Sequence, residues 1–246
     1  MGLVNAVRFL TILPISIKKK ITERDLGRAA AWFPAVGVLL GGLLFLVFRV
    51  FSFFLSSLTV NAFVLVFWVF LTRGFHLDGL ADTADGIGGG ANREERLAIM
   101  KDSRIGAFGV LVLISLLLLK FTLLGELEGR FYLGALILAA ASGRWMIVLA
   151  IFSFPSAKKG GMGQRFKKHC RITEIIIATI TVLVCAYFTL GFRGIILLPG
   201  TGAVVMATAF AFAKSLGGLT GDTYGALCEI GEVVSLLGIN LLLGLT

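Results

Sequence analysis

Long apolar runs separated by short polar segments fill most of this 246-residue chain. A helix needs roughly 20 apolar residues to cross a bilayer, and seven runs come close to that length. They lie at about 31–55, 60–80, 105–124, 131–152, 172–192, 194–213 and 230–246. The pattern predicts an all-α polytopic membrane protein with about seven transmembrane helices, in one domain that covers residues 1–246.

The first fifteen or so residues are apolar, but they are too few to span and contain Arg8 and Pro14. We expect them to form a short interfacial or re-entrant helix. Lys18, Lys19 and Lys20 follow directly. Most of the other Lys and Arg residues also fall in alternate connections between the apolar runs, which is typical of loops on the cytoplasmic side. The sequence therefore predicts a multi-pass protein of the cell membrane with a cytoplasmic N-terminus.

Composition supports the membrane assignment. Hydrophobic residues make up 57% of the chain and charged residues 15%, with a mean hydropathy of +0.96, whereas a soluble domain averages about a quarter charged residues. These values exclude an ordinary soluble domain, a disordered chain and a disulfide scaffold. The net charge of +9 would suggest nucleic acid in a soluble protein. Here the cations lie between spans, so membrane lipid is expected as a partner and nucleic acid is not.

The most informative polar segment holds Asp78, Asp82 and Asp85, directly after the apolar run 63–71. We expect one helix to continue out of the bilayer through both. At about 100° per residue, the three carboxylates then share a face about 60° wide. Like charges at this spacing repel, and oxygen ligands of this type favour Mg²⁺ or Mn²⁺. The alternative is that the Asp-Gly pairs are solvated turns. The spacing favours metal binding.

His76 is predicted on the opposite face from Asp78, about 200° away. It suits a structural, hydrogen-bonding or substrate-binding role better than metal ligation.

Farther along, Asn92 and Glu95 predict a capping box that opens a short helix. Lys101 and Arg104 follow it with Asp102 between them. They either neutralise a diphosphate, with Asp102 as a metal ligand, or are ordinary positive anchors.

A second polar segment, before the last apolar run, contains Asp222, Glu229 and Glu232. On a helix these acids lie within about 80° of one another. Acids that open a transmembrane helix are costly unless they face a cavity or a partner. We interpret them as a second wall of the same cytoplasmic cavity, so that the site is built from about 73–109 and 214–232. The alternative is that this segment only packs against other helices and that the acids cap its helix.

The block from Gly74 to Gly86, Gly-Phe-His-Leu-Asp-Gly-Leu-Ala-Asp-Thr-Ala-Asp-Gly, closely resembles the signature of the adenosylcobalamin-5'-phosphate synthase (cobalamin synthase) family. The likeness extends over nearly the whole chain, to the segments 9–14, 33–34, 99–106 and 217–226. The acidic block is more distantly similar to CDP-alcohol phosphotransferases, but no Ala-Arg pair follows its first Asp-Gly.

The resemblance implies a magnesium-dependent transferase of late cobalamin biosynthesis. It would join adenosylcobinamide-GDP to α-ribazole or α-ribazole 5'-phosphate and release GMP. Asp78 and Asp82 would then hold Mg²⁺, and Asp85 would be a second ligand or the base. Asp222 and Glu229 would complete metal coordination or hold the ribazole.

Two other functions remain as alternatives: a CDP-alcohol-type phospholipid phosphotransferase and, with less support, a membrane transporter. A transporter would place ionisable residues near the bilayer midplane, whereas most acids here are expected at one boundary. The preferred lower base and the number of metal ions do not follow from the sequence, and a homo-oligomer is compatible with it.

Overall fold

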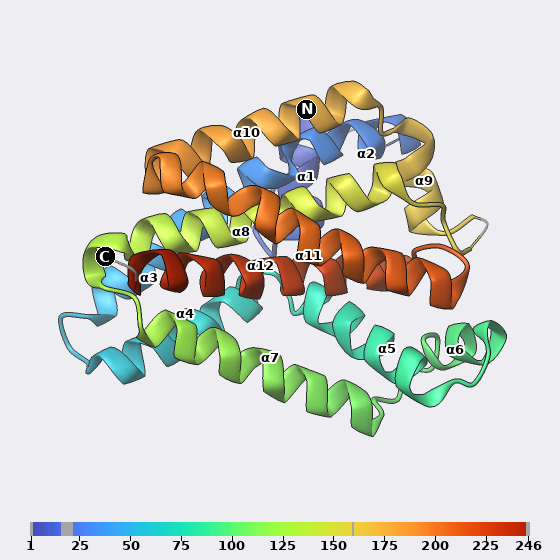
Figure 1. The fold of residues 1–246 in the computed structure, drawn as a ribbon, viewed down its shortest axis with the longest axis horizontal. Helices are drawn as coiled ribbons and strands as arrows, with labels where there is room; N and C mark the ends of the chain where they lie inside the picture. The colour runs from blue at the N-terminus through green and yellow to red at the C-terminus, as the bar shows by residue number, and fades with distance from the viewer. Residues whose placement is uncertain (1, 16–21, 159, 245–246) are drawn as a thin grey trace.

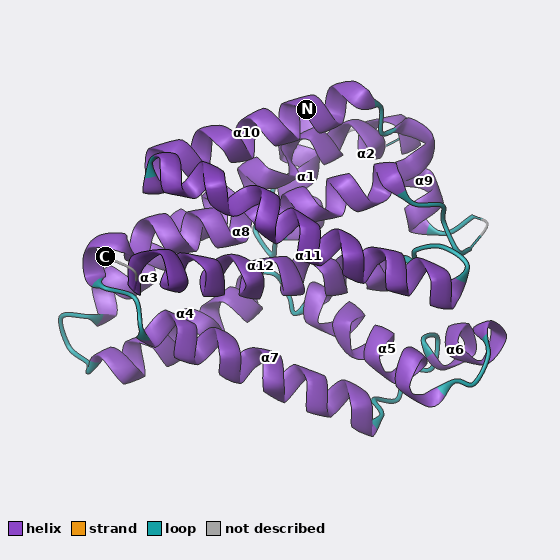
Figure 2. Cartoon of the chain, viewed as in Figure 1, coloured by secondary structure: helices purple, strands orange, loops and turns teal. Residues whose placement is uncertain are grey.

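The computed structural model describes residues 2–15, 22–158 and 160–244, and their regular secondary structure is helical (Figure 2). Lys18, Lys19 and Lys20 lie outside the described residues. In chain order the elements are α1 (Gly2–Leu10), α2 (Glu23–Ala29), the 3₁₀ turn η1 (Ala30–Trp32), α3 (Phe33–Phe51), α4 (Ser57–Leu71), α5 (Phe75–Gly89), α6 (Arg93–Ile99), α7 (Ala107–Gly125), α8 (Gly129–Ser153), α9 (Met162–His169), α10 (Ile172–Leu190), α11 (Phe192–Leu216) and α12 (Gly221–Gly244).

Among these residues, six helical stretches are long and apolar enough to cross a membrane. They are the stretch from α2 to α3 and the helices α7, α8, α10, α11 and α12. The bent pair α4 and α5 makes a seventh if it counts as one broken span. The prediction of an all-α polytopic protein with about seven spans is confirmed. The last helix begins at Gly221 instead of near 230. The acids in its first turns lower the hydropathy of a segment that is nevertheless helical and packed against other helices.

α8 is the central helix of the bundle and contacts α3, α10 and α12 (Figure 1). Most of its apolar stretch is buried inside the protein. Gly37 and Gly41 let α3 approach it closely, since an added Cβ at either position would lie 2.5 Å from backbone atoms of Ala141 or Ile137. Small residues spaced by four commonly allow such close contacts between membrane helices.

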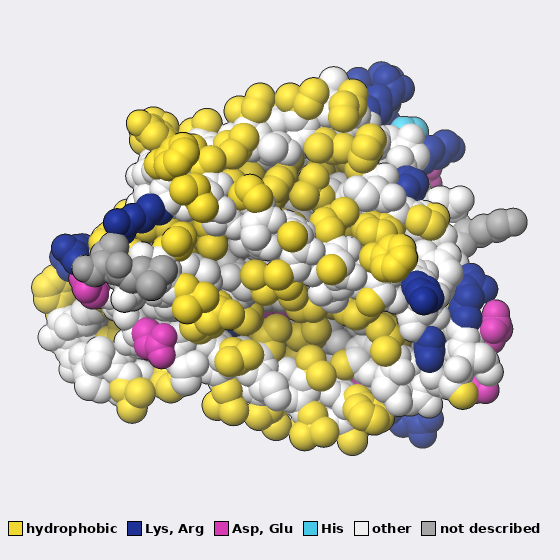
Figure 3. Space-filling view, in the orientation of Figure 1, with side chains coloured by type: hydrophobic (Ala, Val, Ile, Leu, Met, Phe, Trp, Pro, Cys, Tyr) yellow, Lys and Arg dark blue, Asp and Glu magenta, His cyan; other side chains and the backbone are white. Residues whose placement is uncertain are grey.

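On the face drawn in Figure 3, the side chains are largely apolar, and Lys and Arg gather toward the two ends of the bundle. Leu111 and Leu118 of α7 are more than half exposed, as are Phe188 of α10 and Phe210 of α11. This distribution is what a lipid environment requires. One end carries α2, α6 and α9 (Figure 1) and is called the basic end below. The N-cap half of the capping box predicted for α6 is confirmed, since Asn92 Oδ1 accepts the N–H of Glu95 at 3.0 Å, whereas the Glu95 carboxylate accepts from the backbone N–H of Ala91 instead of that of Asn92.

α1 is not a loose surface helix. Asn5, Ala6, Val7 and Leu10 are buried, and the chain after α1 is bonded to α4, because Ile12 N donates to the carbonyl of Leu71 at 2.8 Å. α1 therefore docks where α4 ends.

Candidate active site

The second predicted span is broken in the structure. α4 ends at Leu71, α5 begins at Phe75, and the two axes are bent by 85°. Arg73 and Gly74 connect them with φ angles of 56° and 63°, a left-handed backbone through which an α-helix does not continue. The prediction of one continuous helix over 60–80 is wrong, because hydropathy does not report backbone handedness. The Arg-Gly pair after the apolar run was the available signal.

Asp78, Asp82 and Asp85 share one helix, as predicted, but their surroundings differ. Asp78 is exposed, Asp82 is half-buried and Asp85 is buried. The two oxygens of Asp85 accept the N–H groups of Gly106 at 2.7 Å and Gly109 at 2.8 Å. These donors belong to the start of α7, where the helix dipole favours a negative charge. Asp85 therefore joins α5 to α7.

α12 brings a further carboxylate to α5. Gly79 packs on the backbone of Asp222 so closely that an added Cβ would lie 2.6 Å from the Asp222 carbonyl oxygen. The negative charges of Asp78, Asp222 and Asp85 all act on Asp82, and the ammonium of Lys158 partly offsets them. Carboxylates from two helices thus share one region of negative potential.

This set of donors fits Mg²⁺, which is commonly held by one or two carboxylates together with substrate phosphates and water. A cation would also relieve the repulsion among Asp78, Asp82 and Asp222. In the described ranges, no three Asp, Glu, His or Cys side chains lie close enough to hold a metal ion by themselves. The carboxylates therefore suit an ion that a substrate also helps to bind. They do not form a site in which the protein supplies all the ligands.

The segment after α6 carries the other predicted site residues. Lys101 and Arg104 are exposed. Arg104 Nη2 pairs with Asp102 Oδ2 at 2.6 Å. Hydrogen bonds from the side chain and the backbone of Arg104 lower the pKa of the Asp102 carboxyl to about 2. Asp102 is bonded to Arg104, and in the described ranges it belongs to no group of three acid, histidine or cysteine side chains that could hold a metal ion.

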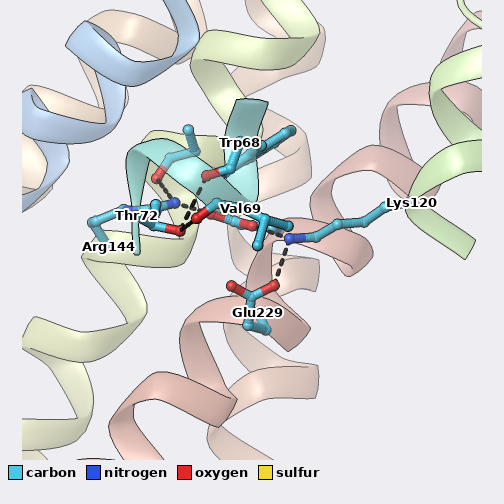
Figure 4. Close-up of polar contacts among 8 residues, drawn as sticks. Trp68, Val69, Thr72, Lys120, Arg144 and Glu229 are labelled. Carbon is cyan, nitrogen blue, oxygen red and sulfur yellow. Dashed lines mark hydrogen bonds and ion pairs between the residues drawn. The ribbon is translucent and has the colours of Figure 1, made fainter. Parts of the chain in front are cut away.

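Glu229 and Glu232 form a buried ion-pair cluster instead of a wall of that site (Figure 4). Lys120 Nζ of α7 contacts Glu229 at 2.5 Å and also Glu232, and Glu232 pairs in addition with Arg144 of α8. All four side chains are at most 3% exposed. The structure favours the packing alternative for both acids over a wall of the Asp78 cavity, because they do not line it and partners on two other spans neutralise them inside the bundle. Local sequence patterns give no signal for this pairing, because Lys120 and Glu229 are 109 positions apart in the chain.

The same cluster lies beside the end of α4. Lys120 Nζ is 4.8 Å from the ring centroid of Trp68. The hydroxyl of Thr72 donates to the carbonyls of Trp68 and Val69 in the last turn (Figure 4). The ion pairs therefore hold α7, α8 and α12 together next to the break that starts α5.

His76 is 1% exposed, and neither ring nitrogen has a hydrogen-bond partner. With Tyr224 and several Phe residues it lines an enclosed cavity of about 30 Å³, and none of the α5 acids lines that cavity. This space admits water-sized molecules only. The expectation that His76 lies away from the carboxylate face agrees with this placement.

A larger, open cavity of about 640 Å³ lies beside the break and is walled by α1, α5 and the start of α7. Asp78 lines it, and so do Arg8 and Arg73. The remaining lining is mostly apolar, for example Phe9, Leu77 and Leu113. Local sequence patterns do not place Arg8 and Arg73 at one cavity, because 65 positions separate them in the chain.

The fold and the site define a polytopic membrane protein with a carboxylate-rich helix that begins at a broken span. The family profile of cobalamin-5-phosphate synthase matches residues 2–240, and the chain belongs to this family. A protein of Roseiflexus sp. (strain RS-1) is 42% identical over 96% of this chain and 88% of its own length. One of Herpetosiphon aurantiacus is 41% identical over 95% and 94% of the two lengths, and one of Caldanaerobacter subterraneus subsp. tengcongensis 32% over 98% of each.

All three relatives are named adenosylcobinamide-GDP ribazoletransferase. The family resemblance seen in the sequence is therefore confirmed, and the chain is a transferase. No solved structure gives a significant match to it.

Proposed function

We propose that this chain joins adenosylcobinamide-GDP to α-ribazole or α-ribazole 5'-phosphate and releases GMP, in the last steps of cobalamin biosynthesis. The names of its relatives support these substrates. The observation that carries the proposal is the close packing of α5 on α12 at Gly79 and Asp222, with Asp78 of α5 opening into a cavity of about 640 Å³. Pockets for small molecules and cofactors have about this volume.

The reaction is a phosphoryl transfer. The acceptor hydroxyl oxygen bonds to the phosphorus attached to the corrinoid, the bond from that phosphorus to the oxygen of GMP breaks, and the hydroxyl proton is released. Catalysis of such transfers rests on positioning and charge neutralisation. Side chains that fix the diphosphate therefore matter more than a strong nucleophile from the protein.

Asp78 and Asp82 are the residues proposed to hold Mg²⁺, with Asp222 facing them from α12. When bound, the ion would neutralise charge on the diphosphate. Asp85, with its oxygens bonded to Gly106 and Gly109, is assigned to fixing α5 against α7. This differs from its expected role as base or second ligand.

We further propose that the basic end faces the cytoplasm, where the nucleotide substrate is found. The abundance of Lys and Arg in the connections at α2, α6 and α9 supports this orientation. Fluorescein-maleimide labelling of a cysteine introduced at Lys101, in intact cells and in broken cells, tests it. Labelling only after lysis is expected, and equal labelling of intact cells would contradict the orientation.

The test of the activity is GMP release by the purified protein in proteoliposomes, with adenosylcobinamide-GDP, α-ribazole 5'-phosphate and Mg²⁺. Asp82→Asn is expected to abolish it, and Glu94→Gln, at an exposed acid of α6, is expected to retain it. Protein-free liposomes are the blank. Wild-type protein that releases no GMP but turns over a CDP-alcohol would refute the proposal in favour of a phospholipid phosphotransferase.

A further inference from the structure

We infer that Arg8 and Arg73 form the phosphate-binding wall of the cavity that contains Asp78. The inference rests on the proposed function and names the cations of that site. Both arginines line the cavity of about 640 Å³ with Asp78. Lys101 and Arg104, which the sequence suggested for this role, are exposed and do not line it.

The charge of the cavity favours an anion. Its lining contains two guanidinium groups and one carboxylate, so it is formally positive even before a metal ion joins Asp78. Among the described residues, neither Arg8 nor Arg73 has a carboxylate within ion-pair distance, whereas Lys120 and Arg144 do. The apolar side chains around them lower the local dielectric and so strengthen attraction to an anion.

Arg8 has a donor that nothing in the described structure satisfies. Its Nη1 is buried and has no hydrogen-bond partner. A buried donor left in this state destabilises the protein unless a ligand or water accepts from it. Once the side chain turns so that Nη1 reaches the cavity, a phosphate oxygen there is a suitable acceptor, because guanidinium groups bind phosphate with strong, charge-assisted hydrogen bonds.

Arg73 is held in place at the same wall. Its Nη2 donates to the carbonyl of Thr11 at 2.6 Å and toward that of Arg8 at 3.4 Å. Arg8 lies in the last turn of α1 and Thr11 directly follows the helix, so part of the guanidinium caps the end of α1. Nε and Nη1 make no hydrogen bond to the described residues, which leaves three of the five N–H donors for a ligand. The left-handed φ of Arg73 places this side chain at the break.

Direct binding tests the inference without turnover. Inorganic pyrophosphate, the probe, is titrated into the purified full-length protein in neutral-lipid nanodiscs at constant Mg²⁺, with Arg8→Gln, Arg73→Gln and the matched control Arg49→Gln. Arg49 is an exposed arginine at the far end of α3. Loss of a charge-assisted hydrogen bond of about 1.5–3 kcal/mol weakens binding by roughly 10- to 100-fold. We expect that loss in the first two variants and none in Arg49→Gln.

Steady-state kinetics with adenosylcobinamide-GDP provide the second readout. Arg8→Gln and Arg73→Gln are expected to raise KM by at least about tenfold, and Arg8→Lys and Arg73→Lys to recover part of that loss. A role confined to capping α1 would lower the melting temperature of Arg73→Gln and leave KM unchanged. Arg8 makes no side-chain hydrogen bond to any residue that the structure describes, so Arg8→Gln is expected to keep the fold, and the test stands on this variant alone.

The outcomes separate this inference from the proposed function. Wild-type affinity and KM in both Gln variants, with GMP still released, would overturn the phosphate-binding wall and leave the function standing. Arginine-dependent pyrophosphate binding by a wild-type protein that releases no GMP would support the wall and refute the substrates. A third outcome would overturn the inference in favour of a lipid headgroup. In that case pyrophosphate binding is unchanged in the Gln variants, and anionic lipid changes the melting temperature only when both arginines are present.

Discussion

Arg144 of α8 and Glu232 of α12 form a salt bridge in which both side chains are completely buried. Glu232 also receives the ammonium of Lys120, which in turn contacts Glu229, so two cations and two anions form a neutral cluster. Burying such charges is expensive, and removing one of them leaves its partner uncompensated. The cluster lies next to the break between α4 and α5, so its integrity bears on the position of the acidic helix.

Glu232→Gln is expected to destabilise the protein by about 3–5 kcal/mol, because it leaves Arg144 buried without a counter-charge. Ser235→Ala is the matched control. Ser235 is on the same helix and fully buried, and its hydroxyl has no hydrogen-bond partner. Unfolding in mixed micelles, followed by circular dichroism, gives both values. A loss below about 1 kcal/mol for Glu232→Gln would contradict the ion pair.

Lys120→Met and Glu229→Gln should be coupled. Each alone unbalances the cluster, but the double variant leaves the neutral pair Arg144 and Glu232. We expect the double variant to be more stable than the sum of the single losses predicts, by about 0.5–3 kcal/mol. The same cycle with Glu94→Gln, an exposed acid of α6, should show additivity. Equal coupling energies in the Lys120–Glu229 cycle and the Lys120–Glu94 cycle would exclude a specific contact between Lys120 and Glu229.

Gly79→Ala is expected to separate α5 from α12, since its Cβ would lie 2.6 Å from the carbonyl oxygen of Asp222. Such overpacking costs about 1–3 kcal/mol, and it should lower GMP release because it moves the two acidic helices apart. Gly42→Ala on α3 meets nothing within 4 Å and should be neutral or stabilising. Melting temperature and activity of the two variants are compared. Wild-type activity in Gly79→Ala would contradict the close packing.

Asp85→Asn should loosen the start of α7. An amide accepts through one oxygen only, so one of the N–H groups of Gly106 and Gly109 loses its acceptor, at a cost of about 1–3 kcal/mol. Faster hydrogen exchange over 101–109 is the expected signature. Asp78→Asn serves as comparison. It should reduce activity without changing this exchange, because Asp78 is exposed and accepts neither bond. Identical exchange in the two variants would rule out the anchoring role.

Several features of the fold and the site follow directly from local patterns in the chain. Apolar runs predict spans because every transmembrane helix must cover the same thickness of hydrocarbon. The spacing of Asp78, Asp82 and Asp85 puts them on one helix, which α5 confirms. The cap at Asn92 is likewise a short-range interaction between neighbours in sequence, and α6 begins where it predicts.

Glu229 and Lys120 show what local patterns could not supply. Hydropathy treats an acid within a span as a boundary signal, since it does not include the cation that another helix brings to it. The pairing joins residues 109 positions apart. It exists only once α7 packs on α12, and only then is a charge inside the bundle tolerable.

The membrane class, the span positions and the acidic face of α5 could thus be inferred from the chain alone, because period and hydrophobicity act over a few turns of helix. Packing decided which carboxylates are free. It bonded Asp85 to α7, buried Glu232 against Arg144, and left Asp78 in a cavity with Arg8 and Arg73. The physical reason is that the electrostatic free energy of a side chain depends on the charges and donors that fold around it.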